Sequence, residues 1–172
     1  MTKNTKTTIN KHFEIGHENL LKKNLDIAEK HFLESLKINQ KHFETLFLIG
    51  ALYIVIKKFD LALVYLNKAI KIKPEHSNVN LNLGIVFKKL GKIEKSINHH
   101  EIAIKLNPNN TDAICGLAKI QEDKKLINDA KLNYEKVLKI DPNHKIACHL
   151  YGKILLKINR HVEGLNFIKK AS

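Results

Sequence analysis

Histidine and cysteine are the side chains of this sequence with the most potential chemistry, and there are ten histidines and two cysteines. Both residue types ligate zinc. His99 and His100 are adjacent, however, and neighbouring residues of a helix point about 100° apart, so these two do not converge on one ion. Cys115 and Cys148 fit no metal-binding spacing. We therefore expect no metal site. We interpret the cysteines and His149 as buried or groove-lining side chains, and His100 as a core histidine with its polar atoms satisfied.

Motifs that carry enzymatic chemistry are absent from the sequence. It contains no glycine-rich phosphate loop, no Gly-x-Ser-x-Gly turn and no His-Glu-x-x-His motif. The sequence therefore predicts no catalytic residue, no cofactor and no enzymatic activity of this chain by itself.

The chain is strongly basic, with a formal net charge of +13. Lysine supplies nearly all of this charge, and Arg160 is the single arginine. Nucleic-acid sites usually use arginine for bidentate contacts and stack bases on aromatic rings. Here lysine, asparagine and isoleucine are abundant along the whole chain, a bias typical of an AT-rich genome. We favour a solvated basic surface over a nucleic-acid site, with electrostatic binding to nucleic acid or another acidic surface as an alternative.

The cellular compartment is suggested by what the sequence lacks. The N-terminus is polar and without the apolar stretch of a secretory signal. No apolar run approaches the ~20 residues needed to cross a bilayer. Two cysteines are too few for a disulfide-stabilised scaffold. We expect a protein of the reducing cytoplasm with no membrane partner.

Small residues and prolines recur every 34 residues, and four such columns run in phase. A period of this length is typical of helical repeat arrays, so any functional side chain is positioned by copies of one repeated unit. The columns are Gly16, Gly50, Gly84, Ala118 and Gly152; Ala28, Ala62, Ser96, Ala130 and Gly164; Ser35, Ala69, Ala103, Val137 and Ala171; and Pro74, Pro108 and Pro142.

Each unit is expected to contain two helices. Apolar residues follow a helical period on both sides of a short polar turn such as Lys57-Lys58. The small residues at the Gly50 and Ala62 positions let the two helices approach closely, whereas larger side chains would wedge them apart. Proline ends the second helix because it lacks the N–H and clashes with the preceding turn.

Two stretches of the sequence resemble tetratricopeptide repeats. They are LFLIGALYIVIKKFDLALVYLNKAIKIKP (46–74) and NLGIVFKKLGKIEKSINHHEIAIKLNP (82–108). The resemblance covers about residues 9–172. It implies an all-α fold, a right-handed α-solenoid of stacked helix-turn-helix repeats of 34 residues. As a function it implies a scaffold or adaptor that binds a protein or peptide.

We expect a polar N-terminal tail over residues 1–8, followed by about five repeats. Gln40 stands where later units have proline, which predicts a looser first junction. The last repeat is incomplete and has no polar capping helix. Either it acts as the end of the array, or the chain is the N-terminal piece of a longer protein. The predicted repeats are 9–42, 43–76, 77–110, 111–144 and 145–172.

The resemblance also implies that ligands bind in a concave groove lined by the first helix of each repeat. The expected lining is apolar toward the N-terminus and charged toward the C-terminus, which suits a peptide or helix with large hydrophobic anchors and acidic groups. The alternative is that Phe13, Phe47 and Leu81 only pack between helices. The candidate groove residues are Phe13, His17, Phe47, Ala51, Leu81, Ile85, Lys88, Lys89, Lys119 and Lys153.

A second function stays open on the sequence alone. Similar arrays occur in the N-terminal regions of larger bacterial enzymes, with a glycosyltransferase-, sulfotransferase- or oxygenase-type domain downstream. The incomplete last repeat motivates this alternative. The identity of the partner and the oligomeric state are not encoded in any recognisable motif.

Overall fold

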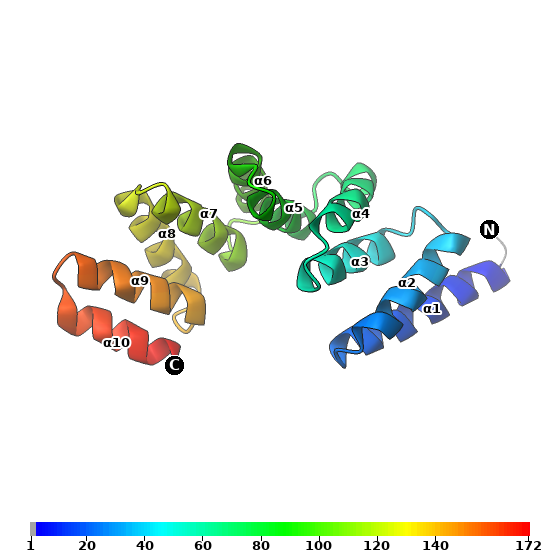
Figure 1. Ribbon diagram of the computed structural model, residues 1–172, viewed down its shortest axis with the longest axis horizontal. Helices are drawn as coiled ribbons and strands as arrows, with labels where there is room; N and C mark the ends of the chain where they lie inside the picture. The colour runs from blue at the N-terminus through cyan, green and yellow to red at the C-terminus, as the bar shows by residue number, and fades with distance from the viewer. Residues whose placement is uncertain (1–2) are drawn as a thin grey trace. The chain divides into compact units, whose positions relative to one another are not determined.

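The computed structural model describes residues 3–172, with side chains described from Thr7 onward. In these residues the chain forms ten α-helices and no strand (Figure 1), as the helical periodicity predicts. None of these helices combines the length and the apolar character that crossing a membrane requires. The helices are α1 (Lys3–Leu21), α2 (Leu25–Ile38), α3 (Phe43–Val55), α4 (Phe59–Ile72), α5 (Ser77–Lys89), α6 (Ile93–Leu106), α7 (Thr111–Asp123), α8 (Ile127–Ile140), α9 (Lys145–Lys157) and α10 (His161–Ala171).

The helices follow the 34-residue period of the sequence. The first helices α3, α5, α7 and α9 begin at residues 43, 77, 111 and 145, and the second helices begin at residues 25, 59, 93, 127 and 161. Contacts join α1 to α2, α3 to α4, α7 to α8 and α9 to α10. The prediction of about five helix-turn-helix units is confirmed. The fifth unit contains both of its helices, although α10 has 11 residues where α8 has 14.

The N-terminal residues differ from the prediction of a separate tail over residues 1–8. Helix α1 begins at Lys3, so residues 3–8 extend the first helix. Once a helix nucleus exists, each added residue contributes a hydrogen bond, so a polar stretch is enough to prolong it. Ile9 is 2% exposed and fixes this end of the helix in the core.

Glycine permits the close approach of the paired helices at several units. A β-carbon added to Gly16 would lie 2.7 Å from the ring of Phe32, and one added to Gly50 would lie 2.8 Å from Leu66. Real side chains do not tolerate such separations, so these positions accept no larger residue without a shift of the neighbour. Ala62, on the helix opposite Gly50, is fully buried.

The turn inside each pair passes through one residue with left-handed backbone. In the second unit this residue is Lys57, whose N–H donates to the carbonyl of Ile54, while the Lys58 N–H donates to Tyr53. This is the Schellman arrangement that ends many helices. Glycine adopts the left-handed conformation freely, but only one unit uses it. The left-handed residues, with φ between 61° and 71°, are Lys23, Lys57, Gly91, Lys125 and Asn159.

The turns between units are closed by a side chain. Oδ1 of Asn39 accepts the N–H of Lys41 at 3.0 Å, and Asn107 and Asp141 make the equivalent bond at 3.1 and 3.0 Å. The first junction, which has Gln40 in place of proline, therefore has the same hydrogen bond as the junctions with proline. The structure does not show the looser turn that we expected there.

The chain divides into two compact parts, Met1–Gly91 with α1 to α5 and Lys92–Ser172 with α6 to α10. We call them the N-terminal part and the C-terminal part and describe each by itself. The N-terminal core is built around Phe32, Ile49 and Leu66, and a C-terminal core is built around Tyr134 and Ile154. The division falls between the two helices of the third predicted repeat.

Candidate functional site

The predicted groove residues lie on first helices of both parts. In the N-terminal part, α1 contacts α3 and α3 contacts α5, so the exposed faces of these helices form one surface, which we call the first-helix surface. Lys119 on α7 and Lys153 on α9 belong instead to the C-terminal part. The structure therefore brings together, on the first-helix surface, Phe13, His17, Phe47, Ala51, Leu81, Ile85, Lys88 and Lys89.

Aromatic rings run along this surface. Phe47 lies parallel to Phe43, with 6.3 Å between ring centroids, and 5.4 Å from His76. Phe13 meets His42 edge-on at 5.5 Å. Each phenylalanine thus packs against the histidine that precedes the next first helix. We call these five residues the aromatic cluster.

The predicted residues differ in how far they are buried. Leu81 is 8% exposed and belongs to the core, as the packing interpretation required. Phe13, Phe47 and Ile85 are only half-buried, and His17 and Lys89 are exposed. The two phenylalanines therefore combine both interpretations, since their rings pack between helices and still present an accessible edge.

The histidines of the cluster have a second role that the sequence analysis missed. The N–H of Val79 donates to Nδ1 of His76, which caps α5. Asn110 and His144 accept the equivalent N–H of α7 and α9 at 3.1 and 3.2 Å. Because His42, His76, Asn110 and His144 are spaced by 34 residues and asparagine is a common N-cap, the column itself was the available signal.

Burial and charge act on the His76 ring. Its partial burial, and then the ammonium of Lys73, lower the pKa of His76. The same ammonium lies 4.0 Å from the Phe43 ring centroid, a cation–π contact. The neutral imidazole is the form that accepts the Val79 N–H, so the environment favours the capping form.

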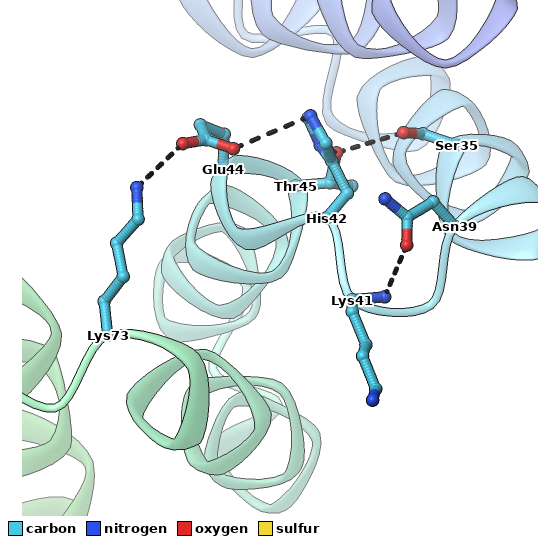
Figure 2. A network of polar contacts seen from close by, with 7 residues as sticks. All are labelled: Ser35, Asn39, Lys41, His42, Glu44, Thr45 and Lys73. Atoms are coloured by element: carbon cyan, nitrogen blue, oxygen red, sulfur yellow. Dashed lines mark hydrogen bonds and ion pairs between the residues drawn. The ribbon is translucent and has the colours of Figure 1, made fainter. Parts of the chain in front are cut away.

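A polar network crosses the first junction (Figure 2). Oγ1 of Thr45 lies 3.1 Å from Oγ of Ser35 and 2.7 Å from Nδ1 of His42. Nε2 of His42 lies 3.6 Å from Glu44, which accepts a hydrogen bond of 3.1 Å from Lys73. Burial opposes ionisation of Glu44, but its own backbone N–H and Lys73 still hold the pKa of this carboxyl below its usual value. The network ties α2, the start of α3 and the turn after α4 together.

Lys119 is engaged within the C-terminal part. Its Nζ lies 3.3 Å from Glu122 and 3.6 Å from Asp123. Glu122, with 10% of its side chain exposed, also pairs with Lys157 at 3.8 Å and accepts a hydrogen bond from Tyr134. The charge of Lys119 is thus largely balanced inside the protein, unlike the free cation that the groove prediction assumed.

The candidate chemical residues are structural. His100 is 1% exposed, and its Nδ1–H donates to the carbonyl of Ser96 at 2.8 Å, which confirms the satisfied core histidine. Cys115 and Cys148 are buried free thiols, and burial raises the pKa of Cys115 to about 12. In the described part of the chain, no three His, Cys, Asp or Glu side chains converge as metal ligands.

Paired helices with a strict 34-residue period define the chain as an α-helical repeat protein. The family profile described as tetratricopeptide repeat matches residues 43–76, 77–110 and 111–144, the same bounds that the periodicity gave for the second, third and fourth units. The chain belongs to the tetratricopeptide repeat family. No curated protein sequence matches it significantly.

Solved structures share this fold. PilF of Pseudomonas aeruginosa is 16% identical with a TM-score of 0.86, over 99% of this chain and 79% of PilF. MamA is 24% identical with a TM-score of 0.77, over 95% of this chain and 90% of MamA. YrrB, described as a tetratricopeptide-repeat protein with an unusual peptide-binding site, is 19% identical with a TM-score of 0.68, over 93% of this chain and 82% of YrrB. At these identities the likeness shows the fold.

Proposed function

We propose that the chain is a protein-interaction scaffold that binds a polypeptide segment on the first-helix surface of its N-terminal part. Tetratricopeptide-repeat scaffolds typically mediate contacts between proteins, and YrrB, which has the same fold, is described as having a peptide-binding site. The proposal extends this class of function to a particular surface of this chain.

The half-buried ring of Phe47 is the observation that carries the proposal. Phe43 and His76 hold the ring from two sides, so its orientation is fixed before a ligand arrives. A rigid, partly exposed aromatic ring offers apolar contact area at a small entropic cost. Together with Phe13 and Ile85 it forms an apolar stretch suited to hydrophobic anchors of a bound segment.

Lysines define the expected polarity of the ligand. Lys88 and Lys89 lie in the last turn of α5, where cations are favoured by the helix dipole. An acidic residue near the apolar anchors of the ligand would approach these ammonium groups. The ligand class is therefore a peptide with large apolar side chains next to Asp or Glu.

Selection from a random peptide library tests the proposal with defined probes. Peptides enriched by the wild-type chain are synthesised, and their affinities are measured by fluorescence anisotropy. Phe47→Asp should weaken binding by about 30-fold or more, the loss typical of a central aromatic contact. Phe47→Leu restores the residue type that Leu81 has one repeat later and should retain most of the affinity. Val64→Asp, on the exposed side of α4, is the matched control.

Two results would contradict the proposal. If the selected peptides bind the Phe47→Asp and Val64→Asp variants equally well, while both variants melt cooperatively, the first-helix surface is not the site. If affinity falls steeply with salt and is insensitive to Phe47, the chain binds polyanions through its lysines. The two free thiols support a reducing compartment as the setting in which this binding takes place.

A further inference from the structure

The face formed by α9 and α10 at the end of the C-terminal part has an apolar hollow of about 440 Å³. Its lining includes Ile146 and Leu150 from α9 and Ile168 and Ala171 from α10. Ile146 is 59% exposed, an unusual state for a large aliphatic side chain in a helix of the array.

The equivalent face of each preceding unit is covered by a helix. The residues one or more periods before Ala171 are all fully buried, whereas Ala171 itself is partly exposed. The helices α3, α5, α7 and α9 contact the preceding second helices at these faces. The buried residues of this column are Ser35, Ala69, Ala103 and Val137.

Each covering helix presents a small buried side chain. At the first junction this is Thr45, whose hydroxyl lies 3.1 Å from that of Ser35. The later covering helices have Val79, Ala113 and Ala147 at the same position of the repeat, and each is fully buried. The established interface therefore specifies its own complement, an α-helix with a small residue at the point of contact.

The position of Ile146 breaks the pattern of its column. Earlier first helices have Glu44, Asn78 and Asp112 there. Two of these reach the following unit, since Glu44 pairs with Lys73 at 3.1 Å and Asp112 lies 3.6 Å from His144. The side chain of Ile146 stands where a contact to a further helix is made, but it is apolar.

A second copy of this chain does not provide the complement. Its α1 has Lys11, an exposed lysine, where the covering helices have Thr45, Val79, Ala113 or Ala147. Stacking α1 on the end face would bury that ammonium without a partner, which is strongly unfavourable. Pairing of two end faces would bring two copies of Lys145, which lines the hollow, close together.

We propose that this end face binds an amphipathic α-helix of a partner polypeptide, with a small residue and flanking aliphatic residues on its contact side and acidic residues beside them. Lys145 at the hollow and Lys169 and Lys170 in the last turn of α10 supply the complementary charge. This site is separate from the first-helix surface and does not depend on the function proposed for it.

A helix with the sequence of α9 serves as the probe, because α9 covers the equivalent face of α8. The synthetic peptide spans residues 144–157, has glutamate in place of Lys145 and Lys153, alanine in place of Cys148, and a side-chain staple to fix the helix. Binding to the full chain is measured by fluorescence anisotropy. Saturable binding is expected, and the peptide that keeps both lysines should bind about tenfold more weakly because like charges then meet.

Ile146→Asp is the decisive variant. Asp112 occupies the same place one repeat earlier, so the substitution is compatible with the fold. It should reduce the affinity for the acidic helix by about tenfold or more. Val162→Asp, at a residue 75% exposed on the first turn of α10, should leave the affinity unchanged.

Equal binding of the acidic helix to the wild-type and Ile146→Asp chains, or no saturable binding to the wild type, overturns the proposal. Sedimentation equilibrium tests the other occupant. A concentration-dependent dimer that Ile146→Asp abolishes would show that the face joins two copies of the chain, which also overturns it.

Discussion

Gly152 on α9 and Gly164 on α10 face each other so closely that a β-carbon added to either would lie within 2.8 Å of the carbonyl oxygen of the other. At Gly50 the added atom would also meet a neighbour at 2.8 Å, but that neighbour is the side chain of Leu66. A side chain can change rotamer, whereas a backbone carbonyl moves only with its helix. The two glycines of the same column therefore tolerate a methyl group differently.

We predict that Gly152→Ala destabilises its helix pair by about 2–3 kcal/mol through overpacking. Gly50→Ala should cost at most about 1 kcal/mol, because the strain at Leu66 is partly offset by the higher helix propensity of alanine. Urea unfolding followed by circular dichroism measures both free energies. Equal losses, or a larger loss at Gly50, would show that the α9–α10 approach is looser than described.

The close approach was accessible from sequence because it depends on residue size at a fixed period. Glycine and alanine columns predict that helices nest, and the buried glycines and alanines of α1 to α4 and α7 to α10 lie where the columns placed them. The unit bounds were accessible for the same reason. Both are properties of a repeated pattern, and a repeated pattern can be read without knowing any contact.

Other features depend on contacts that no pattern specifies. Lys119 was expected to be a free cation, but Glu122 and Asp123 lie one turn further along the same helix and neutralise it. The pairing of Glu122 with Lys157 joins different units, and a single sequence gives no sign of it. The extension of α1 to Lys3 was missed because polar residues give no amphipathic signal.

The Ser35–Thr45 hydrogen bond gives a prediction about buried polar groups. Both side chains are fully buried, and the next junction has Ala69 and Val79 at the same positions. Ser35→Ala or Thr45→Val alone should cost about 1–3 kcal/mol, because one hydroxyl loses a buried partner. The double variant recreates the apolar pair of the next junction and should cost less than the sum of the two single changes.

A double-mutant cycle by urea unfolding measures this coupling. The matched control is Ala69→Ser with Val79→Thr, which introduces the hydroxyl pair into the apolar junction. Strict additivity of the two single changes at Ser35 and Thr45 would contradict a direct interaction between them.

The left-handed turn residues predict a gain in stability. Lys57 has φ of 61°, a conformation that costs a non-glycine residue about 1–2 kcal/mol. Lys57→Gly removes this strain at the cost of a more flexible unfolded chain, for a net gain of about 0.5–1 kcal/mol. Lys30→Gly, in the middle of α2, is the control and should lose about 1 kcal/mol. Thermal and urea unfolding measure both, and a loss at Lys57 would mean that its side chain makes a compensating contact.

The stability of the chain should fall as the pH decreases from 7.5 to 5.5. Burial is the first cause that lowers the pKa of His31, His76 and His99 in the folded state. A depressed histidine pKa means that the unfolded chain binds more protons in this range. The stabilisation is fully present above the unfolded pKa, about 6.5, and is lost as the pH falls through the folded pKa.

His76→Asn tests how much of this dependence comes from the cap of α5. Asparagine already caps α7 at the equivalent Asn110, so the variant keeps an acceptor for the Val79 N–H that does not titrate. The ring contacts with Phe43 and Phe47 are lost, so the variant should be less stable at pH 7.5. Its unfolding free energy should nevertheless decline less steeply between pH 7.5 and 5.5 than that of the wild type. The range stays above pH 5.5 because the paired carboxylates, such as Glu44, begin to lose their own contribution at lower pH. Identical slopes for the two proteins would show that protonation of His76 leaves the α5 cap intact.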